Sequence, residues 1–370
     1  MKVLVTGGAG FIGSFIVDEL VRKGHQVRIF DVLDPQVHPG GKKPDYLNPD
    51  AEFIQGDVRD KDALHNALQG QEIVFHEAAA VGMGQSQYQV KHYVDTNTGG
   101  TANLLDLLAN TNHSVQKVMV AASQSSYGEG LCRCPEHGIL KPLFRPEAQL
   151  ADSRWEHECP HCGQVMQPVA TTEDTAMDCR AIYAITKRDQ EDMLMSIGGT
   201  YRIPCVALRY FNVYGPRQSL SNPYTGVLAI FMSRLKNGNR PVIYEDALQT
   251  RDFISVHDVV QANIRAMENS NADYQIFNTG TGIPTTIKDV ALLLAQVYNS
   301  SIEPEVTGHY RKGDTRHCFA DIRKIQEKIG FQPSVSLVEG MKELVAWSET
   351  AEAVDQFETA TQELAKRGLV

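Results

Sequence analysis

A glycine-rich turn near the start of the chain constrains its fold more than any other feature. The segment Gly7-Gly8-Ala9-Gly10-Phe11-Ile12-Gly13 follows an apolar run at residues 3–6 and precedes a helical pattern at residues 15–23. Glycines spaced in this way allow a tight turn and a close approach of the backbone to a ligand, and the next helix N-terminus favours a pyrophosphate. The pattern predicts a dinucleotide-binding unit, with either Gly7 or Gly8 as its first glycine. The residues expected at the dinucleotide are Gly7, Gly10, Phe11, Ile12 and Gly13.

Acidic residues further along indicate which dinucleotide would bind. Asp31 ends a second apolar run at residues 26–30. A carboxylate there accepts hydrogen bonds from the adenosine ribose and repels a 2′-phosphate, which predicts NAD rather than NADP. Asp57 and Val58 follow a third run, at residues 51–55, and are expected beside the adenine. For both aspartates, a purely structural role in a turn is the alternative.

Apolar runs and helical patterns alternate through the first half of the chain. Further runs cover residues 73–76, 117–122 and 205–210, and helical patterns cover residues 61–68, 100–110 and 184–196. Strands that are apolar on both faces belong to a parallel sheet covered by helices. We therefore expect an α/β fold, with a Rossmann-type doubly wound parallel sheet and a smaller C-terminal substrate-binding lobe.

The rhythm changes after residue 212, where loops rich in Pro, Gly and Asn separate shorter elements. We expect a Rossmann domain at residues 1–212, a lobe at residues 213–350 with helices near 286–298 and 338–350, and a polar helical tail at residues 351–370. The segment 130–172 lacks clear periodicity and is expected to be an insert in the first domain. A loop of that length needs another source of order.

Charge and cysteine content exclude several kinds of partner. The chain has 35 basic and 45 acidic side chains, a net charge of -10, which disfavours nucleic acids and anionic membranes. No apolar run approaches the roughly 18 residues that a membrane helix needs. A predicted strand at residue 3 leaves no room for a signal peptide, and the cysteine content suits a reducing compartment. We expect a cytoplasmic protein.

Three side chains carry the expected chemistry. Tyr183 lies four residues before Lys187, which puts a phenol and an ammonium on one helix face. Ser123 follows the run at residues 117–122, at the sheet edge where α/β proteins bind ligands. A nearby cation favours the phenolate that a general base requires. The Tyr–Lys pair alone would also suit a solvated helix face.

With these motifs the chain resembles the extended short-chain dehydrogenases/reductases, specifically the NAD-dependent nucleotide-sugar epimerase/dehydratase family. Besides the glycine turn, Asp31 and the Ser–Tyr–Lys set, the resemblance rests on His76-Glu77-Ala78-Ala79-Ala80, Asn97-Thr98-Gly99-Gly100-Thr101, Arg209-Tyr210-Phe211-Asn212-Val213-Tyr214-Gly215-Pro216, Arg251-Asp252-Phe253-Ile254-Ser255-Val256-His257-Asp258 and Gly313-Asp314-Thr315-Arg316. It implies that Tyr183 is the base, that Lys187 and the positive nicotinamide ring lower its pKa, and that Ser123 bonds the reacting oxygen. It also implies a homodimer and a nucleotide diphosphate sugar substrate. The further cofactor contacts that it implies are Ala78, Ala79, Ala80, Asn97, Tyr183 and Lys187, with a structural cap as the alternative for Asn97.

The resemblance also bears on the type of reaction. Family dehydratases carry Asp-Glu directly after the Ser or Thr, and decarboxylases keep the glutamate, whereas this chain has Gln124 and Ser125. Neither side chain protonates a leaving hydroxyl, which favours a 4-epimerase. Residues 80–86 and the insert resemble the dTDP-L-rhamnose 4-epimerase branch. UDP-glucose, UDP-galactose and UDP-glucuronate epimerases, a dehydratase or decarboxylase, and a non-catalytic NAD sensor are the alternatives.

Substrate contacts follow from the same resemblance. Arg251 and Arg311 match phosphate-binding arginines, and arginine suits phosphate because it donates two parallel hydrogen bonds. Arg217 and Arg316 are weaker candidates that solvent alone could explain. The complete set of expected substrate contacts is Gly82, Ser123, Ser125, Asn212, Arg217, Arg251 and Arg311.

The insert carries a metal-binding pattern. Cys134-Pro135-Glu136-His137-Gly138 and Cys159-Pro160-His161-Cys162-Gly163 are similar half-sites with ligands two residues apart. Two such knuckles complete a tetrahedron, which predicts one structural zinc ion on Cys134, His137, Cys159 and Cys162. Cys132 competes with His137 as the fourth ligand. Free thiols in a loop, or a disulfide, would also be compatible with this spacing.

Overall fold

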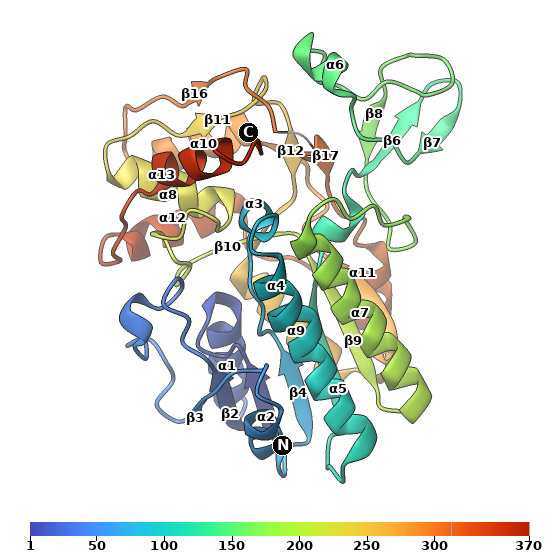
Figure 1. The fold of residues 1–370 in the computed structure, drawn as a ribbon, viewed down its shortest axis with the longest axis vertical. Helices are drawn as coiled ribbons and strands as arrows, with labels where there is room; N and C mark the ends of the chain where they lie inside the picture. Colours follow the sequence, from blue (N-terminus) through green and yellow to red (C-terminus); the bar gives the residue numbers. More distant parts are fainter. Residues whose placement is uncertain (312, 370) are drawn as a thin grey trace.

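A seven-stranded parallel sheet lies at the centre of the protein in its computed structural model, which describes residues 1–311 and 313–369 (Figure 1). Lys312 in the predicted lobe and Val370 in the predicted tail lie outside the described residues. The strands are β1 (Lys2–Thr6), β2 (Gln26–Asp31), β3 (Glu52–Gln55), β4 (Ile73–His76), β5 (Lys117–Ser123), β9 (Cys205–Tyr210) and β14 (Gln275–Thr279). Their order, β14-β9-β5-β4-β1-β2-β3, confirms the predicted doubly wound sheet.

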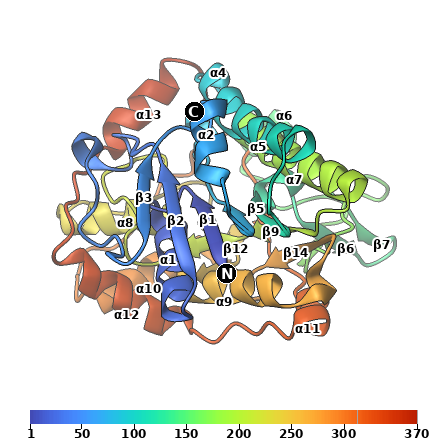
Figure 2. The same cartoon turned by 90° about the horizontal axis from the view of Figure 1, so that it is seen from below.

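Helices cover both faces of this sheet, as Figure 2 shows. One face carries α1 (Phe11–Arg22), α9 (Val256–Glu268) and α11 (Arg323–Ile329), and the other carries α2 (Lys61–Leu68), α5 (Gly100–Asn110) and α7 (Ile182–Tyr201). Val3 and Val5 pack with the first set of helices, and Leu4 between them packs with the second. Successive strand side chains alternate between faces, so a strand covered on both sides must be apolar throughout.

The sheet and its helices extend beyond the boundary predicted at residue 212. The elements β14, α9 and α11 all come from the region predicted to form the smaller lobe. As an edge strand, β14 pairs only with β9, and its short apolar stretch ends in Asn278 and Thr279, so the sequence predicts no strand there. The helix α1 begins at Phe11, within the glycine-rich segment and before the predicted start, and α7 extends past both predicted ends.

A smaller lobe packs three helices around an apolar cluster of its own. These helices are α8 (Val227–Lys236), α10 (Ile287–Val297) and α12 (Leu337–Ser348). Short strands surround them: β10 (Asn212–Tyr214), β11 (Val242–Ile243), β12 (Thr250–Arg251), β13 (Phe253–Ser255), β15 (Thr285–Thr286), β16 (Glu305–Val306) and β17 (His317–Cys318).

The insert protrudes at the upper right of Figure 1 and contains more regular structure than its sequence suggests. The strands β6 (Leu131–Cys134), β7 (Gly138–Leu140) and β8 (Gln167–Val169) form an antiparallel sheet. The short helix α6 (Glu147–Ala151) lies between β7 and β8 in the chain, and Figure 1 shows it at the top of the insert. The buried members of its apolar cluster are three cysteines and a methionine. So small a cluster stabilises the insert only weakly.

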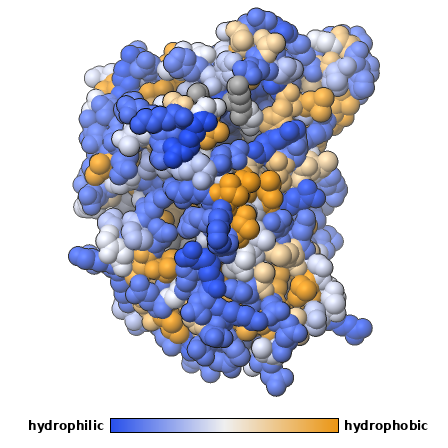
Figure 3. Space-filling view, in the orientation of Figure 1, coloured by the Kyte–Doolittle hydropathy of each residue, from blue (hydrophilic) through white to orange (hydrophobic). Residues whose placement is uncertain are grey.

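The tail forms α13 (Phe357–Ala365), which is shorter than the predicted helix and partly apolar. Ala360 and Leu364 are buried, and Leu364 lies over Gly84 of α3 (Met83–Ser86). The remaining short helices are α4 (Val90–Tyr93), the π-helix η2 (Val94–Gly99), and the 3-10 helices η1 (Pro39–Gly41), η3 (Gln124–Tyr127) and η4 (Ser270–Ala272). The face in Figure 3 is largely hydrophilic, and within the described residues no helix has both the length and the apolar character to cross a membrane.

Candidate active site

A cavity of about 400 Å³ opens at the carboxyl edge of the parallel sheet. Its wall comes from the glycine turn, the ends of β2 to β5, the first turns of α7 and the segment that leads from β9 into α8. Parallel strands bring their carboxyl ends to one edge, and this is where α/β sheets bind ligands. The predicted site residues on this wall are Gly7, Gly10, Phe11, Ile12, Gly13, Asp31, Asp57, Val58, Ala78, Ala79, Ala80, Ser123, Tyr183, Lys187 and Asn212.

Backbone geometry explains why the turn at one end of the cavity needs glycine. Gly7 has a φ of +70°, and a Cβ there would lie 2.7 Å from the backbone nitrogen of Ala78. A Cβ at Gly13 would lie 2.3 Å from the carbonyl oxygen of Gly7. Gly10 caps α1 without a side chain, so the positive end of the helix dipole is left open to a ligand. This cradle fits the pyrophosphate of a dinucleotide.

The carboxylate of Asp31 is held rigidly on the cavity wall. Oδ2 accepts a hydrogen bond from the backbone N–H of Ala9 at 3.0 Å, and Oδ1 accepts one from that of Leu33 at 2.9 Å. Each oxygen keeps a lone pair for a further donor, which suits ribose hydroxyls. Asp57 also lines the cavity, but Arg59 Nε donates to both of its oxygens at 2.9 and 3.0 Å.

Asn97 lies behind the wall rather than on it. Its amide pairs with both backbone groups of Ala80, with Oδ1 2.7 Å from the nitrogen and Nδ2 3.1 Å from the oxygen. Nδ2 also donates to Thr186 of α7 at 2.9 Å. The fully buried Asn97 therefore positions Ala80 and joins the wall to the helix that carries Tyr183.

The structure brings Ser123, Tyr183 and Lys187 together on the cavity wall. Ser123 is the last residue of β5, and Tyr183 and Lys187 occupy the first two turns of α7. Lys187 Nζ donates to the carbonyl oxygen of Ala121 at 2.7 Å, which anchors the ammonium beneath the end of the strand. Ser125 Oγ donates to Ser123 Oγ at 2.9 Å, so Ser125 supports the serine from outside the cavity wall.

Burial controls the protonation of this group. Burial raises the pKa of Tyr183 to about 12, although its hydrogen bond with Ser123 opposes the shift. Burial lowers the pKa of Lys187 to about 8, and the nearby carboxylate of Glu77 opposes that shift. In the protein alone Tyr183 is therefore a neutral phenol, and the expected lowering of its pKa requires more positive charge than Lys187 provides.

Several predicted substrate contacts do not line this cavity among the described residues: Gly82, Ser125, Arg217, Arg251 and Arg311. Gly82 lies between the hydroxyl of Tyr93 and Tyr224, where a Cβ would approach to 2.9 and 3.0 Å. Arg217 donates to Asp18 at 2.7 Å and stacks on Phe15, so α1 holds it.

Contacts in the smaller lobe hold the other arginines, and Arg316 is also held by Glu156 of the insert. Arg251 donates to the carbonyl oxygens of Thr315 at 2.6 Å and Arg316 at 3.2 Å. Arg311 stacks on Tyr244 at 4.5 Å from the ring centre, and its Nε is buried without a hydrogen-bond partner among the described residues. Arg316 is fully buried among carboxylates, so it is not available to a phosphate.

Asn212 is the predicted substrate residue with the clearest unmet bonding capacity. It lines the cavity, and its buried Oδ1 has no hydrogen-bond partner in the part of the chain that the structure describes. Buried amide oxygens are normally paired, so this atom is expected to accept a hydrogen bond from a bound ligand.

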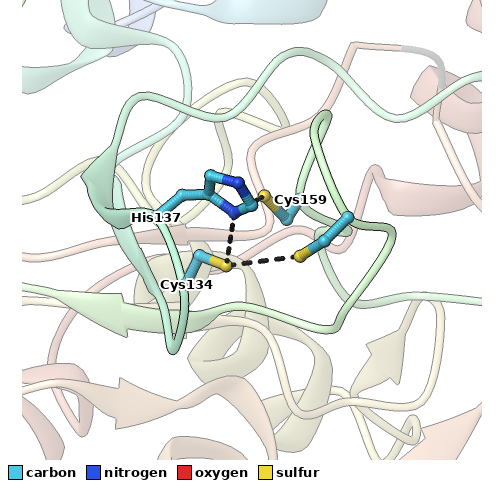
Figure 4. Close-up of side chains that lie close together, drawn as sticks. Cys134, His137 and Cys159 are labelled. Atoms are coloured by element: carbon cyan, nitrogen blue, oxygen red, sulfur yellow. Dashed lines mark hydrogen bonds between the residues drawn. The ribbon is translucent and has the colours of Figure 1, made fainter.

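The predicted metal ligands converge in the insert, as Figure 4 shows for Cys134, His137 and Cys159. The Cys134 sulfur lies 3.5 Å from His137 Nδ1 and 3.6 Å from the Cys162 sulfur, and the Cys159 sulfur lies 3.6 Å from His137 Nδ1. Zn–S bonds of about 2.3 Å in a tetrahedron place sulfurs roughly 3.8 Å apart. The four ligand atoms, all within 4.8 Å of one another, thus fit a zinc ion, and Cys132 is not part of the group.

Glu77 is a prominent residue of the cavity wall to which the sequence alone assigns no role. In the sequence it is only one member of the motif His76-Glu77-Ala78-Ala79-Ala80. A carboxylate among apolar residues at the end of a buried strand was the available signal, because charged groups are rarely buried without a specific reason.

Comparison with known proteins places this site in a family. A profile of the NAD dependent epimerase/dehydratase family matches residues 3–148, and one for GDP-mannose 4,6 dehydratase matches residues 162–344. A dTDP-L-rhamnose 4-epimerase from Burkholderia thailandensis is 35% identical over 94% of this chain and 94% of its own length. The chain belongs to the NAD-dependent epimerase/dehydratase family.

Solved structures of epimerases share the fold of this family member. A UDP-glucose 4-epimerase from Thermotoga maritima, solved with UDP-glucose, is 31% identical with a TM-score of 0.77, covering 94% of this chain and 99% of that one. A UDP-glucose 4-epimerase from Thermus thermophilus, in complex with NAD, is 28% identical with a TM-score of 0.75, covering 95% and 100%. NAD as cofactor and a nucleotide sugar as substrate class follow for the family.

Proposed function

We propose that this protein is an NAD-dependent nucleotide-sugar 4-epimerase. The observation that carries the proposal is the convergence of Ser123, Tyr183 and Lys187 on a cavity whose other end suits a dinucleotide. The side chains after Ser123 argue against a dehydratase, because Gln124 and Ser125 supply no acid for a leaving hydroxyl. Asp31, with an open lone pair on each oxygen, favours NAD over NADP.

In this proposal Tyr183 takes the proton of the sugar 4-hydroxyl, and Ser123 donates a hydrogen bond to the same oxygen. Bound NAD would accept the hydride from C4 and return it in the second half of the reaction, and its oxidised form would add positive charge to the cavity. Lys187 adds the second positive charge, and together these charges lower the pKa of the phenol against the effect of burial. Tyr183 later returns the proton, after the keto-sugar has turned its opposite face toward the cofactor.

We propose Arg251 and Arg311 as diphosphate anchors, supported by their match to the phosphate-binding arginines of the family and by the Nε of Arg311, which is unpartnered within the described residues. Asn212, with its unpartnered oxygen on the wall, is the proposed contact near the sugar. The proposed substrate is a dTDP-deoxysugar such as dTDP-L-rhamnose, supported by the rhamnose epimerase relative. UDP-sugars are the second candidate, because the compared structures are UDP-glucose 4-epimerases.

The test combines a substrate panel with an isotope label. Incubation with dTDP-, UDP- and GDP-sugars, read by NMR, is expected to show inversion at C4 of one class without added NAD being consumed. A substrate carrying ²H at C4 is expected to keep the label at C4. Transfer of the label to C6 would identify a 4,6-dehydratase instead, and loss to solvent would identify enolisation.

Two structural features complete the proposal. The Cys134–His137–Cys159–Cys162 group is proposed to hold zinc with four protein ligands, which leaves no position for water and makes the ion structural. The helices α5 and α7 lie side by side on the outside of the molecule (Figure 1) and are the proposed homodimer face. Light scattering is expected to give twice the mass of one chain.

A further inference from the structure

The cavity wall holds a charged group that the proposed reaction leaves unused, the carboxylate of Glu77, directly after β4. Its Oε1 accepts a hydrogen bond from the hydroxyl of Tyr210 at 3.0 Å. That hydroxyl in turn accepts one from Asn263 Nδ2 at 2.7 Å. Tyr210 ends β9 and Asn263 lies in the middle of α9, so two packed elements fix the position of the carboxylate.

The other oxygen of Glu77, Oε2, forms no hydrogen bond with the residues that the structure describes. Glu77 is half-buried on the cavity wall, and a carboxylate oxygen accepts hydrogen bonds, so Oε2 is available to a donor on a bound ligand. Glu77 also lies close enough to Lys187 for each to influence the protonation of the other. The cavity thus contains a carboxylate and an ammonium near Tyr183.

We propose that Glu77 contacts the bound cofactor and sets the preference of the cavity for its oxidised form, an inference that rests on the proposed use of NAD. The oxidised nicotinamide ring is positively charged and the reduced ring is neutral. The ammonium of Lys187 is needed near Tyr183, where it favours the phenolate. Without a compensating negative charge, the same ammonium would repel the positively charged oxidised ring. Glu77 offsets that repulsion, so that the site keeps a charged Lys187 and still retains NAD.

The test measures which form of the cofactor the intact protein retains. The protein is incubated with equimolar NAD and NADH in excess, separated from free dinucleotide and extracted, and both forms are quantified by chromatography. Glu77→Gln keeps an acceptor for Tyr210 and removes only the charge. Its bound NADH-to-NAD ratio is expected to rise about tenfold over wild type, which corresponds to about 30 mV for a two-electron couple.

The matched control is Glu77→Asp, which keeps the charge and is expected to stay near the wild-type ratio. A general loosening of the pocket would weaken both forms equally and leave the ratio unchanged. A wild-type ratio in Glu77→Gln therefore overturns the proposal.

A second measurement needs only the wild-type protein. Burial raises the pKa of Glu77 to about 7, so the NADH-to-NAD ratio is expected to rise as the pH falls through this value. The groups that face Glu77 are Lys187, whose pKa burial lowers to about 8, and Tyr210, whose pKa burial raises well above its usual value. Lys187 loses its positive charge at higher pH, which also favours NAD over NADH. This second fall in the NADH-to-NAD ratio is expected to persist in Glu77→Gln.

The outcomes separate this inference from the proposed function. If the NADH-to-NAD ratio of the wild type does not change near neutral pH, the proposed role of Glu77 is overturned. If the protein retains neither NAD nor NADH, both the role of Glu77 and the proposed function are overturned. If the NADH-to-NAD ratio rises in Glu77→Gln but the wild-type protein epimerises none of the tested sugars, the role of Glu77 is supported and only the proposed reaction is refuted.

Discussion

Tyr183 sits where the protein alone opposes the ionisation that a general base requires. Burial raises its pKa to about 12, whereas the reference value for tyrosine is about 10. The Ser123 hydrogen bond works in the opposite direction without reversing this shift. The phenol is therefore expected to become an effective base only when the cofactor adds its positive charge, which couples proton removal to cofactor occupancy.

Replacing the phenolic oxygen tests this assignment at the scale of one atom. Tyr183→Phe is expected to lower kcat by about 10²–10⁴, the usual contribution of a general base, while bound NAD is retained. Turnover by NMR and cofactor content by extraction provide the two readings. Tyr201→Phe, at the exposed end of the same helix, is the matched control and is expected to behave as wild type. Near-normal turnover of Tyr183→Phe would remove Tyr183 from the mechanism.

At the scale of elements, the two knuckles of the insert depend on each other. Cys134 and His137 flank the turn between β6 and β7, and Cys159 and Cys162 lie in the loop before β8. Burial raises the pKa of the Cys159 thiol, but backbone N–H donors from His161 and Cys162 outweigh it and lower the pKa to about 7. Such donors stabilise a thiolate, which is the form that binds zinc.

Metal analysis tests this element directly. Protein purified without chelator is expected to contain about one zinc ion per chain, because structural sites use four protein ligands. The Cys159→Ser/Cys162→Ser variant is expected to lose the ion and to show early proteolysis within the insert, since ligation supplies its folding free energy. Cys132→Ser is the control and is expected to keep the ion. A fully folded and active metal-free wild type would contradict the assignment.

The terminal helix α13 connects two parts of the cavity wall. The Glu363 carboxylate accepts hydrogen bonds from the hydroxyls of Tyr224 at 2.9 Å and Tyr88 at 3.2 Å. Tyr224 belongs to the segment that lines the cavity through Asn222, and Leu364 packs over α3, which contributes Gln85 to the wall. The helix therefore holds two wall segments together from outside.

Weakening these contacts is expected to speed cofactor exchange. In a Glu363→Ala/Leu364→Ala variant, labelled NAD is expected to leave severalfold faster than from wild type, because both wall segments lose their common anchor. The control is Lys366→Ala on the exposed side of the same region. Equal release rates in all three proteins would show that α13 does not stabilise the wall.

At the scale of the whole molecule, a buried network of charges joins the insert to the smaller lobe. Arg316 is fully buried and pairs with Glu245 and Asp246 of the lobe and with Glu156 of the insert. Arg145 of the insert also pairs with Glu245, at 2.8 Å. A buried pair contributes little over an apolar substitute, but removal of one partner leaves uncompensated charge.

Arg316→Met is therefore expected to lower the free energy of unfolding by about 3–5 kcal/mol, measured by urea denaturation. The ion pair of the exposed Arg323 with Asp321 is the contrast, and Arg323→Ala is expected to lower the free energy of unfolding much less than Arg316→Met. Equal effects of the two substitutions would show that burial of the network is energetically unimportant.

The same network predicts a loss of stability in acid. Burial would raise the pKa of Glu156, but hydrogen bonds from His317 and Arg316 outweigh it and lower the pKa to about 2. A carboxyl with a lowered folded-state pKa stabilises the protein above its unfolded value of about 4.3. This contribution is lost as the pH falls from there toward 2. Tm is expected to fall in this window, and less steeply in Glu156→Gln.

The sequence by itself determined the local features whose causes are local. The glycine turn follows from steric limits at Gly7 and Gly13, the doubly wound sheet from continuous apolar strands, and the metal cluster from the short spacing within each knuckle. The convergence of Ser123 with Tyr183 was also predictable, because strand ends and the next helix meet at one sheet edge.

Tertiary structure decided what depends on distant residues. The edge strand β14 has too little apolar sequence to predict it, and only pairing with β9 makes it a strand. Arg316 resembles a phosphate ligand until three carboxylates from two parts of the chain surround it. Glu77 acquires a role only because β9 and α9 fix its carboxylate on the cavity wall. Burial and long-range partners set the charge and availability of such groups, and neither is encoded in the spacing of neighbouring residues.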